Sequence, residues 1–191
     1  MLKALVVACN TATSAAITQL RQAYPNLIIV GIEPALKLAA DRYPGGKLGV
    51  MATPMTLREE KFALLMERFA ENNEIYKIPA PGLVELIESG KADSAETEAL
   101  LGQLFAPYPL LDALVLGCTH YPFASRAIAR VMGPKVALLD GGEGTARETQ
   151  RRLRQAGLLW EGPGQITFMN SENSEAMRQT MLQLLEDPQT P

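Results

Sequence analysis

The stretch ALVVACNTAT, residues 4–13, runs from aliphatic side chains through a cysteine into small polar residues. A short continuous apolar run suits a strand that is covered on both faces, as in a parallel sheet. Asn and Thr are favoured where helices start. The stretch therefore predicts a strand that ends near Cys9 and turns at once into a helix.

A second stretch, LVLGCTHYP at residues 114–122, has the same form around Cys118. Further aliphatic runs predict strands, with amphipathic segments between them, at residues 3–8, 26–31, 47–52, 74–79, 111–117, 135–140 and 165–169. Residues 56–72 predict one helix, with Thr56 and Glu59 as its capping box. The alternation predicts an α/β fold, doubly wound and with mainly parallel sheets. Because ligands bind at the carboxyl ends of such strands, both cysteines are expected at a site.

Composition narrows the class of protein. The chain has 191 residues, of which 47% are hydrophobic, and its net charge of -3 is dispersed, which argues against nucleic-acid and membrane partners. It contains no apolar run long enough for a membrane span and no secretory signal pattern, so we expect a cytoplasmic protein. Two cysteines and one histidine are too few ligands for the usual zinc site, and we expect no metal.

The two cysteines favour acid–base chemistry. Backbone N–H groups at a helix start stabilise a thiolate, and His120 lies two positions beyond Cys118, where it could assist proton transfer. Two thiols facing each other could take a proton from one side of a carbon and return one to the other side, which inverts a stereocentre. The alternative is two inert core cysteines and a structural histidine.

Polar neighbours of the cysteines could hold a ligand. Asn10, Thr11 and Thr119 suit a carboxylate-bearing molecule, although the same residue types also serve simply as helix caps. Thr53, at another strand end, is a weaker candidate. Glu88, by its pattern alone, reads as a solvated residue in the last turn of a helix. The glycines of residues 138–146 lack the spacing of a phosphate loop and favour a plain turn.

The two cysteine stretches together resemble the signature motifs of the glutamate racemase family, within the cofactor-independent aspartate/glutamate racemase superfamily. Four further segments resemble family segments in the right order: GIEPALK at residues 31–37, GVMATPMTL at 49–57, PGLVELIESG at 81–90 and LLDGGEGTA at 138–146. The resemblance covers nearly the whole chain.

The resemblance implies a reaction and a set of site residues. Cys9 and Cys118 would be the two catalytic acid/base groups, one for each enantiomer of glutamate, with His120 assisting Cys118 and Glu88 approaching His120. The residues that would hold the substrate are Asn10, Thr11, Thr119 and Thr53. No pyridoxal phosphate or other cofactor is implied, and the product would serve peptidoglycan synthesis.

The resemblance also implies two α/β lobes with the active-site cleft between them. Residues 1–32 and 141–191 would belong to the first lobe and residues 33–140 to the second. The family has an Asp-Ser strand and a Pro-Tyr-Gly loop upstream of the first cysteine, whereas only residues 1–3 precede ALVVACN here. We therefore expect an incomplete first lobe, no acidic partner for Cys9, and weak or absent activity in this form.

Two other readings stay open at this stage. One is a cysteine-dependent isomerase or lyase of the same superfamily that acts on another small dicarboxylate. The other is a binding fragment without catalysis that pairs with another chain. The expected partner is a small molecule, glutamate in the first reading, and a homodimer is one of the assemblies that the sequence leaves open.

Overall fold

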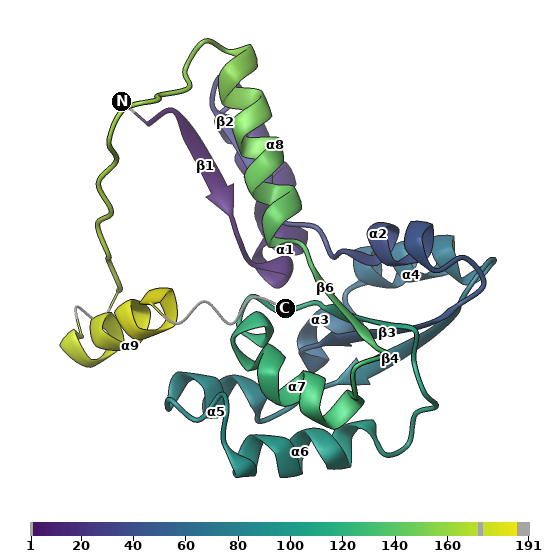
Figure 1. The fold of residues 1–191 in the computed structure, drawn as a ribbon. Helices are drawn as coiled ribbons and strands as arrows, with labels where there is room; N and C mark the ends of the chain where they lie inside the picture. Colours follow the sequence, from purple (N-terminus) through teal and green to yellow (C-terminus); the bar gives the residue numbers. More distant parts are fainter. Residues whose placement is uncertain (1, 172–173, 187–191) are drawn as a thin grey trace.

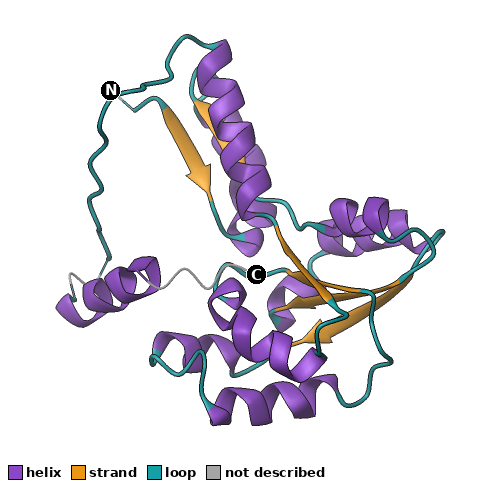
Figure 2. Ribbon diagram, in the orientation of Figure 1, coloured by secondary structure: helices purple, strands orange, loops and turns teal. Residues whose placement is uncertain are grey.

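The computed structural model describes residues 2–171 and 174–186. Six strands alternate with helices along this part of the chain (Figure 1, Figure 2). The order is β1 (Ala4–Val7), α1 (Asn10–Ala23), β2 (Ile28–Gly31), α2 (Leu36–Arg42), β3 (Lys47–Ala52), α3 (Pro54–Arg58), α4 (Glu60–Ala70), β4 (Glu74–Pro79), α5 (Leu83–Glu88), α6 (Ala95–Phe105), β5 (Ala113–Leu116), the 3-10 helix η1 (Tyr121–Ala124), α7 (Ser125–Met132), β6 (Ala137–Asp140), α8 (Gly142–Gln155) and α9 (Glu175–Glu186).

The strands form two parallel sheets, which confirms the predicted fold class. One sheet has two strands, β1 and β2, and the other has four in the order β4-β3-β5-β6. Each described pair of neighbouring strands is parallel. The larger sheet and its helices form one body, while β1, β2, α1 and α8 form a second body above it in Figure 1.

The four-stranded sheet is buried on both faces. Along β3, Leu48, Val50 and Ala52 pack with residues of α2 and α4, whereas Met51 packs with residues of α5, α6 and α7. This alternation follows from the two-residue period of a strand, and the continuous apolar sequence of β3 follows from having helices on both faces. The sheet thereby fixes the position of its carboxyl edge, where β5 ends just before Cys118.

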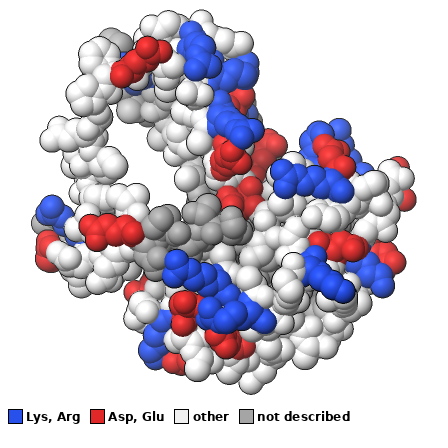
Figure 3. Space-filling model, in the orientation of Figure 1, with Lys and Arg blue, Asp and Glu red and all other residues white. Residues whose placement is uncertain are grey.

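The two-stranded sheet is packed much more lightly. Asn10 is the one buried residue of α1, no described residue of α8 is buried, and Val6 of β1 is 41% exposed. Helices α1 and α8 contact both of its strands. On the face shown in Figure 3, acidic and basic side chains are interspersed, in keeping with the dispersed charge of the sequence.

The chain passes between the two bodies twice, and the two passages touch. After β2 it leaves through Glu33, and after β6 it returns through Gly141. A Cβ atom on Gly141 would lie 2.3 Å from the carbonyl oxygen of Glu33, far inside van der Waals contact. Gly141 therefore permits a backbone approach that no other residue would allow at this point.

Two local predictions are wrong. Residues 165–169 do not form a strand: residues 158–170 contain no helix or strand, and Ile166 and Met169 are 69% and 83% exposed. Their aliphatic pattern has no described strand beside it to supply hydrogen bonds. In Figure 1 this segment runs away from the tip of α8 towards α9.

The helix predicted over residues 56–72 is divided. Thr53, not Thr56, is the N-cap, and its Oγ1 accepts a hydrogen bond from the Thr56 amide at 3.2 Å. With Pro54 at the first position, α3 starts earlier than predicted and ends after five residues. Glu59 is extended and separates α3 from α4. Thr56 consequently lies inside α3 and is buried.

Helices that could cross a membrane are absent from the described part of the chain, since none there is long and apolar enough.

Candidate active site

The first half of the candidate site lies where β1 ends. Cys9 is the N-cap residue of α1, and its side chain is exposed. Asn10 is only 8% exposed, and its Nδ2 donates to the carbonyl oxygen of Gly117 at 2.9 Å. Its Oδ1 is buried and has no hydrogen-bond partner in the structure. Asn10 therefore connects the end of β1 with the residue that precedes Cys118, and keeps one acceptor free.

The second half lies where β5 ends. Cys118, half-buried, starts the turn that leads into η1. Its Sγ lies 3.7 Å from Nδ1 of His120, and the Nε2 of the same ring lies 2.9 Å from Oε1 of Glu88 at the end of α5. Glu88, which the pattern assigned to solvent, is 44% exposed in its side chain but directly contacts the histidine. The three side chains thus form one connected row.

Burial and charge act on the Cys118 thiol. Burial is the largest influence and raises its pKa, because a thiolate is costly to desolvate. The backbone N–H groups of His120 and Tyr121 oppose this effect, whereas negative charge at Cys9 and Glu88 adds to it. The net direction is upward, so Cys118 holds its proton at neutral pH. The influence of Cys9 means that a charge on Cys9 disfavours a charge on Cys118.

A row of three threonine hydroxyls joins the first half of the site to the start of α3, which follows β3. The Oγ1 atoms of Thr11 and Thr56 are 2.6 Å apart, and those of Thr56 and Thr53 are 3.0 Å apart. Thr11 lies in α1, whereas Thr53 and Thr56 belong to the start of α3. Thr56 is 2% exposed, while Thr11 and Thr53 are half-buried. Thr11 and Thr53, two of the predicted site residues, are therefore connected through Thr56, which was not among them.

Thr56 is the residue that sequence reasoning placed wrongly, as a helix cap. The available signal was the spacing of two threonines across Pro54 and Met55, one turn apart in a short helix. Thr119, the remaining predicted residue, lies half-buried in the turn between Cys118 and His120.

Metal ligands do not gather at this site. Over the described ranges, no group of three or more His, Cys, Asp or Glu side chains is arranged to hold a metal ion.

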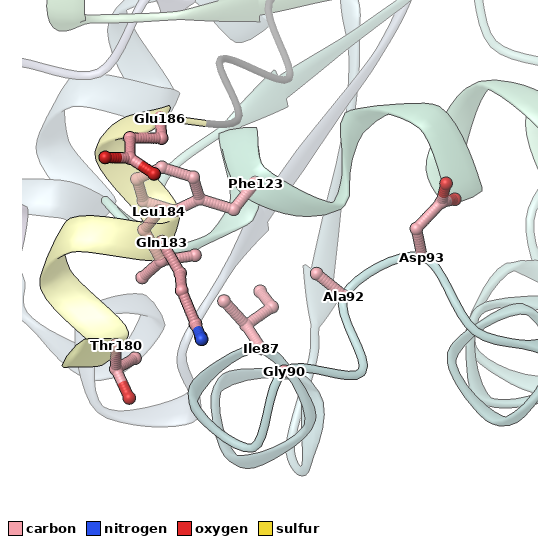
Figure 4. A pocket seen from close by; sticks show the side chains of 9 residues that line it. All are labelled: Ile87, Gly90, Ala92, Asp93, Phe123, Thr180, Gln183, Leu184 and Glu186. Atoms are coloured by element: carbon pink, nitrogen blue, oxygen red, sulfur yellow. The ribbon is translucent and has the colours of Figure 1, made fainter. Parts of the chain in front are cut away.

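A cavity of about 410 Å³ lies between α9 and the end of α5 (Figure 4). Ile87 and Phe123 line it, and neither cysteine does. It is therefore separate from the row of Cys118, His120 and Glu88.

Comparison with known proteins gives consistent matches. The family model described as Asp/Glu/Hydantoin racemase matches residues 2–149. A glutamate racemase of Clostridium botulinum (strain Alaska E43 / Type E3) is 47% identical over 188 residues, which are 96% of this chain and 73% of that protein. This chain thus spans about three quarters of the length of that relative.

Solved structures agree in fold. The glutamate racemase of Thermus thermophilus in complex with β-chloro-D-alanine matches with a TM-score of 0.73 and 32% identity, over 94% of this chain and 68% of that one. The Escherichia coli enzyme in complex with L-glutamate and the activator UDP-MurNAc-ala matches with a TM-score of 0.74 and 27% identity, over 95% and 69%.

Proposed function

This chain belongs to the Asp/Glu/Hydantoin racemase family, and we propose that it interconverts L- and D-glutamate. The observation that carries the proposal is the pair of cysteines at the ends of β1 and β5, strands of two different sheets. Asn10 holds these two strand ends together. We infer the substrate from the relatives, which are glutamate racemases, and assign the acid–base chemistry to the two thiols.

The reaction needs two groups of opposite protonation. One thiolate takes the α-proton of glutamate and becomes a thiol, while the other thiol gives its proton to the opposite face of the α-carbon and becomes a thiolate. The configuration inverts, and the reverse reaction uses the two groups in exchanged roles. Repulsion between charges on Cys9 and Cys118 supports this one-charge arrangement.

His120 and Glu88 assist Cys118. The raised pKa of Cys118 keeps it protonated and ready to donate. When it must act as a base instead, the Nδ1 atom of His120, 3.7 Å away, can stabilise the thiolate as a charged donor. The Glu88 carboxylate then stabilises the charged imidazole from its other nitrogen.

The polar residues around the thiols hold the substrate. Asn10 directly follows Cys9, and its Oδ1, an acceptor without a partner in the structure, suits the α-ammonium group. The hydroxyls of Thr11, Thr119 and Thr53 suit the carboxylates. Placed donors of this kind stabilise the negative charge that develops when the α-proton leaves.

Cys9 has less support than Cys118. In residues 2–171 and 174–186, no side chain makes a hydrogen bond to its exposed thiol, and no carboxylate does for it what Glu88 does through His120. We therefore expect the 191-residue chain on its own to be a slow racemase, limited by the step in which Cys9 is the base.

We also propose a division into lobes, a cellular compartment and an assembly for the enzyme. Residues 1–32 with 141–191, and residues 33–140, act as two lobes that close on the substrate, and the touching passages at Glu33 and Gly141 support that division. Two free thiols suit a reducing cytoplasm. D-glutamate would serve peptidoglycan synthesis, and the assembly to test first is a homodimer.

The test is exchange of the α-proton of L- and D-glutamate with deuterium oxide, followed by NMR, with the Cys9→Ser and Cys118→Ser variants beside the parent chain. Inversion, followed by circular dichroism, should disappear in both variants, because each variant keeps only the thiol that removes the α-proton of one enantiomer. Inversion that survives in either variant excludes the two-thiol reaction. A panel of other small dicarboxylates, run in parallel, would reveal a different substrate.

A further inference from the structure

We propose that Thr56 is a positioning residue whose buried hydroxyl orients the hydroxyl of Thr11 so that it donates to a carboxylate of the substrate. The inference rests on the proposed glutamate site and assigns a role to a residue that does not itself line it. It follows from the chain of hydroxyls that joins α1 with α3.

The contacts of Thr56 leave few options for its proton. Its Oγ1 lies 2.6 Å from that of Thr11 and 3.0 Å from that of Thr53, and the residue is 2% exposed. Water is thus excluded from the middle of this row of three hydroxyls. Because an unsatisfied buried hydroxyl proton is costly, Thr56 donates to one neighbour and accepts from the other.

Each threonine hydroxyl has a single proton, so the three hydroxyls can donate along the row in two favourable directions, which we call orders. In one order, Thr53 donates to Thr56 and Thr56 donates to Thr11, which frees the Thr11 proton. In the other order, Thr11 donates to Thr56 and Thr56 donates to Thr53, which frees the Thr53 proton. The Thr53 oxygen also accepts the Thr56 amide, and its two lone pairs allow this in both orders.

A carboxylate beside Thr11 selects the first order, because a carboxylate only accepts hydrogen bonds. The donors then point the same way from Thr53 to the ligand, and such a chain of hydrogen bonds polarises its members and strengthens the last one. The structure thus predicts that Thr11 and Thr53 do not donate outward at the same time.

The role is not a general property of buried threonines in this fold. Thr97 is completely buried in α6, and its Oγ1 donates to the carbonyl oxygen of Lys91 at 2.6 Å. The Thr97 hydroxyl thus donates to a backbone carbonyl. The Thr56 hydroxyl, in contrast, connects the starts of two helices from different bodies of the structure. Thr97 is therefore a matched control for the loss of a buried hydroxyl.

The test is calorimetric titration of the full chain with L- and D-glutamate, comparing Thr56→Val, Thr56→Ser and Thr97→Val with the parent. Valine keeps the shape of threonine without the hydroxyl, and serine keeps the hydroxyl. We expect Thr56→Val to weaken binding about tenfold, while Thr56→Ser and Thr97→Val stay within about twofold of the parent. In the exchange assay, Thr56→Val should raise KM more than it lowers kcat.

Two results would overturn the inference alone. They are parent-like affinity in Thr56→Val, and equal weakening in Thr56→Ser and Thr56→Val, which would assign the effect to shape. A parent chain that binds neither enantiomer would instead overturn the proposed glutamate site, and this inference with it. The three outcomes are distinguishable because the parent is titrated first.

Discussion

The Glu88 carboxylate lies 2.9 Å from Nε2 of His120, while Nδ1 of the same ring faces the thiol of Cys118 at 3.7 Å. The carboxylate comes from the end of α5 and the thiol from the end of β5, so the imidazole connects two separate elements. The ring thereby contacts a carboxylate on one side and a thiol on the other. The first prediction follows from this relationship.

Replacement of Glu88 by Gln should slow α-proton exchange by roughly tenfold to a hundredfold, the effect of losing a hydrogen bond to a charged group. The amide keeps the shape and can still accept from Nε2, but it lacks the negative charge that stabilises a charged imidazole. The loss should be greater for the enantiomer whose proton Cys118 removes. Glu96→Gln is the control, because it alters only a surface pair with Lys91. Equal rates in Glu88→Gln and the parent would remove Glu88 from the mechanism.

The raised pKa of Cys118 predicts a pH dependence of stability. Its pKa in the folded state lies above the ordinary value of 9.0, so the folded chain binds this proton more tightly than the unfolded chain. The free energy of unfolding should therefore decrease as pH rises above about 9. Urea unfolding between pH 7 and about 10 measures this effect, and Cys118→Ser should remove it in this range; above about 10, the raised pKa values of Tyr121 and Tyr76 lower the stability of both proteins. An equal decrease between about pH 9 and 10 in the serine variant would assign the effect to another group.

The same shift predicts slow alkylation. In a Cys9→Ser background, iodoacetamide should modify Cys118 more slowly at neutral pH than it modifies a free cysteine, since the thiolate reacts. The rate should rise to its plateau at a higher pH than for a model thiol. Mass spectrometry of timed samples gives both rates. Fast modification at neutral pH would contradict the raised pKa.

Replacement of Asn10 by Ala should cost about 1–2 kcal/mol of stability by leaving the buried Gly117 carbonyl without its donor, and should also abolish glutamate binding. Asn73→Ala is a matched control, because Asn73 also donates Nδ2 to a backbone carbonyl and has a buried, unpartnered Oδ1. Urea unfolding and titration separate the two effects. Glutamate affinity that falls equally in both variants would show a general loss of fold.

Replacement of Gly141 by Ala should destabilise the chain by at least about 2 kcal/mol, because the new Cβ would overlap the Glu33 carbonyl oxygen. Gly144→Ala, in the first turn of α8, has no atom within 4 Å of the new Cβ and should stabilise the chain by about 0.5 kcal/mol. Thermal unfolding of both variants gives the comparison. A stable Gly141→Ala protein would mean that the two passages separate freely.

The sequence predicts those helices and strands that depend on residues close together along the chain. Six aliphatic runs became strands, and helices from adjacent segments bury those of the four-stranded sheet, as for β3. The run at residues 165–169 failed because a strand also needs a partner, and no local pattern reveals whether one is present. The position of Thr53 as the cap depended on side-chain geometry in α3 that a four-residue motif resembles only loosely.

For the site residues, too, local signals could be predicted from the sequence and distant contacts could not. Cys9 and Cys118 were identifiable because each one ends its own strand. Glu88 and Thr56 were not identifiable from pattern, because their partners lie 32 and 45 positions away in the chain. Contacts of that separation depend on how the bodies pack, and helical periodicity contains no information about them.

The contact of Glu33 with Gly141 has a consequence for motion. Because both passages of the chain run through one point, we expect the body with α1 to swivel about that point and not to translate away from the four-stranded sheet. Such swivelling would change the gap between the two thiols while each keeps its own strand and helix. In the proposed racemase, the angle at this pivot would then determine which molecules fit between the cysteines, and the rate of opening would limit how quickly a product leaves.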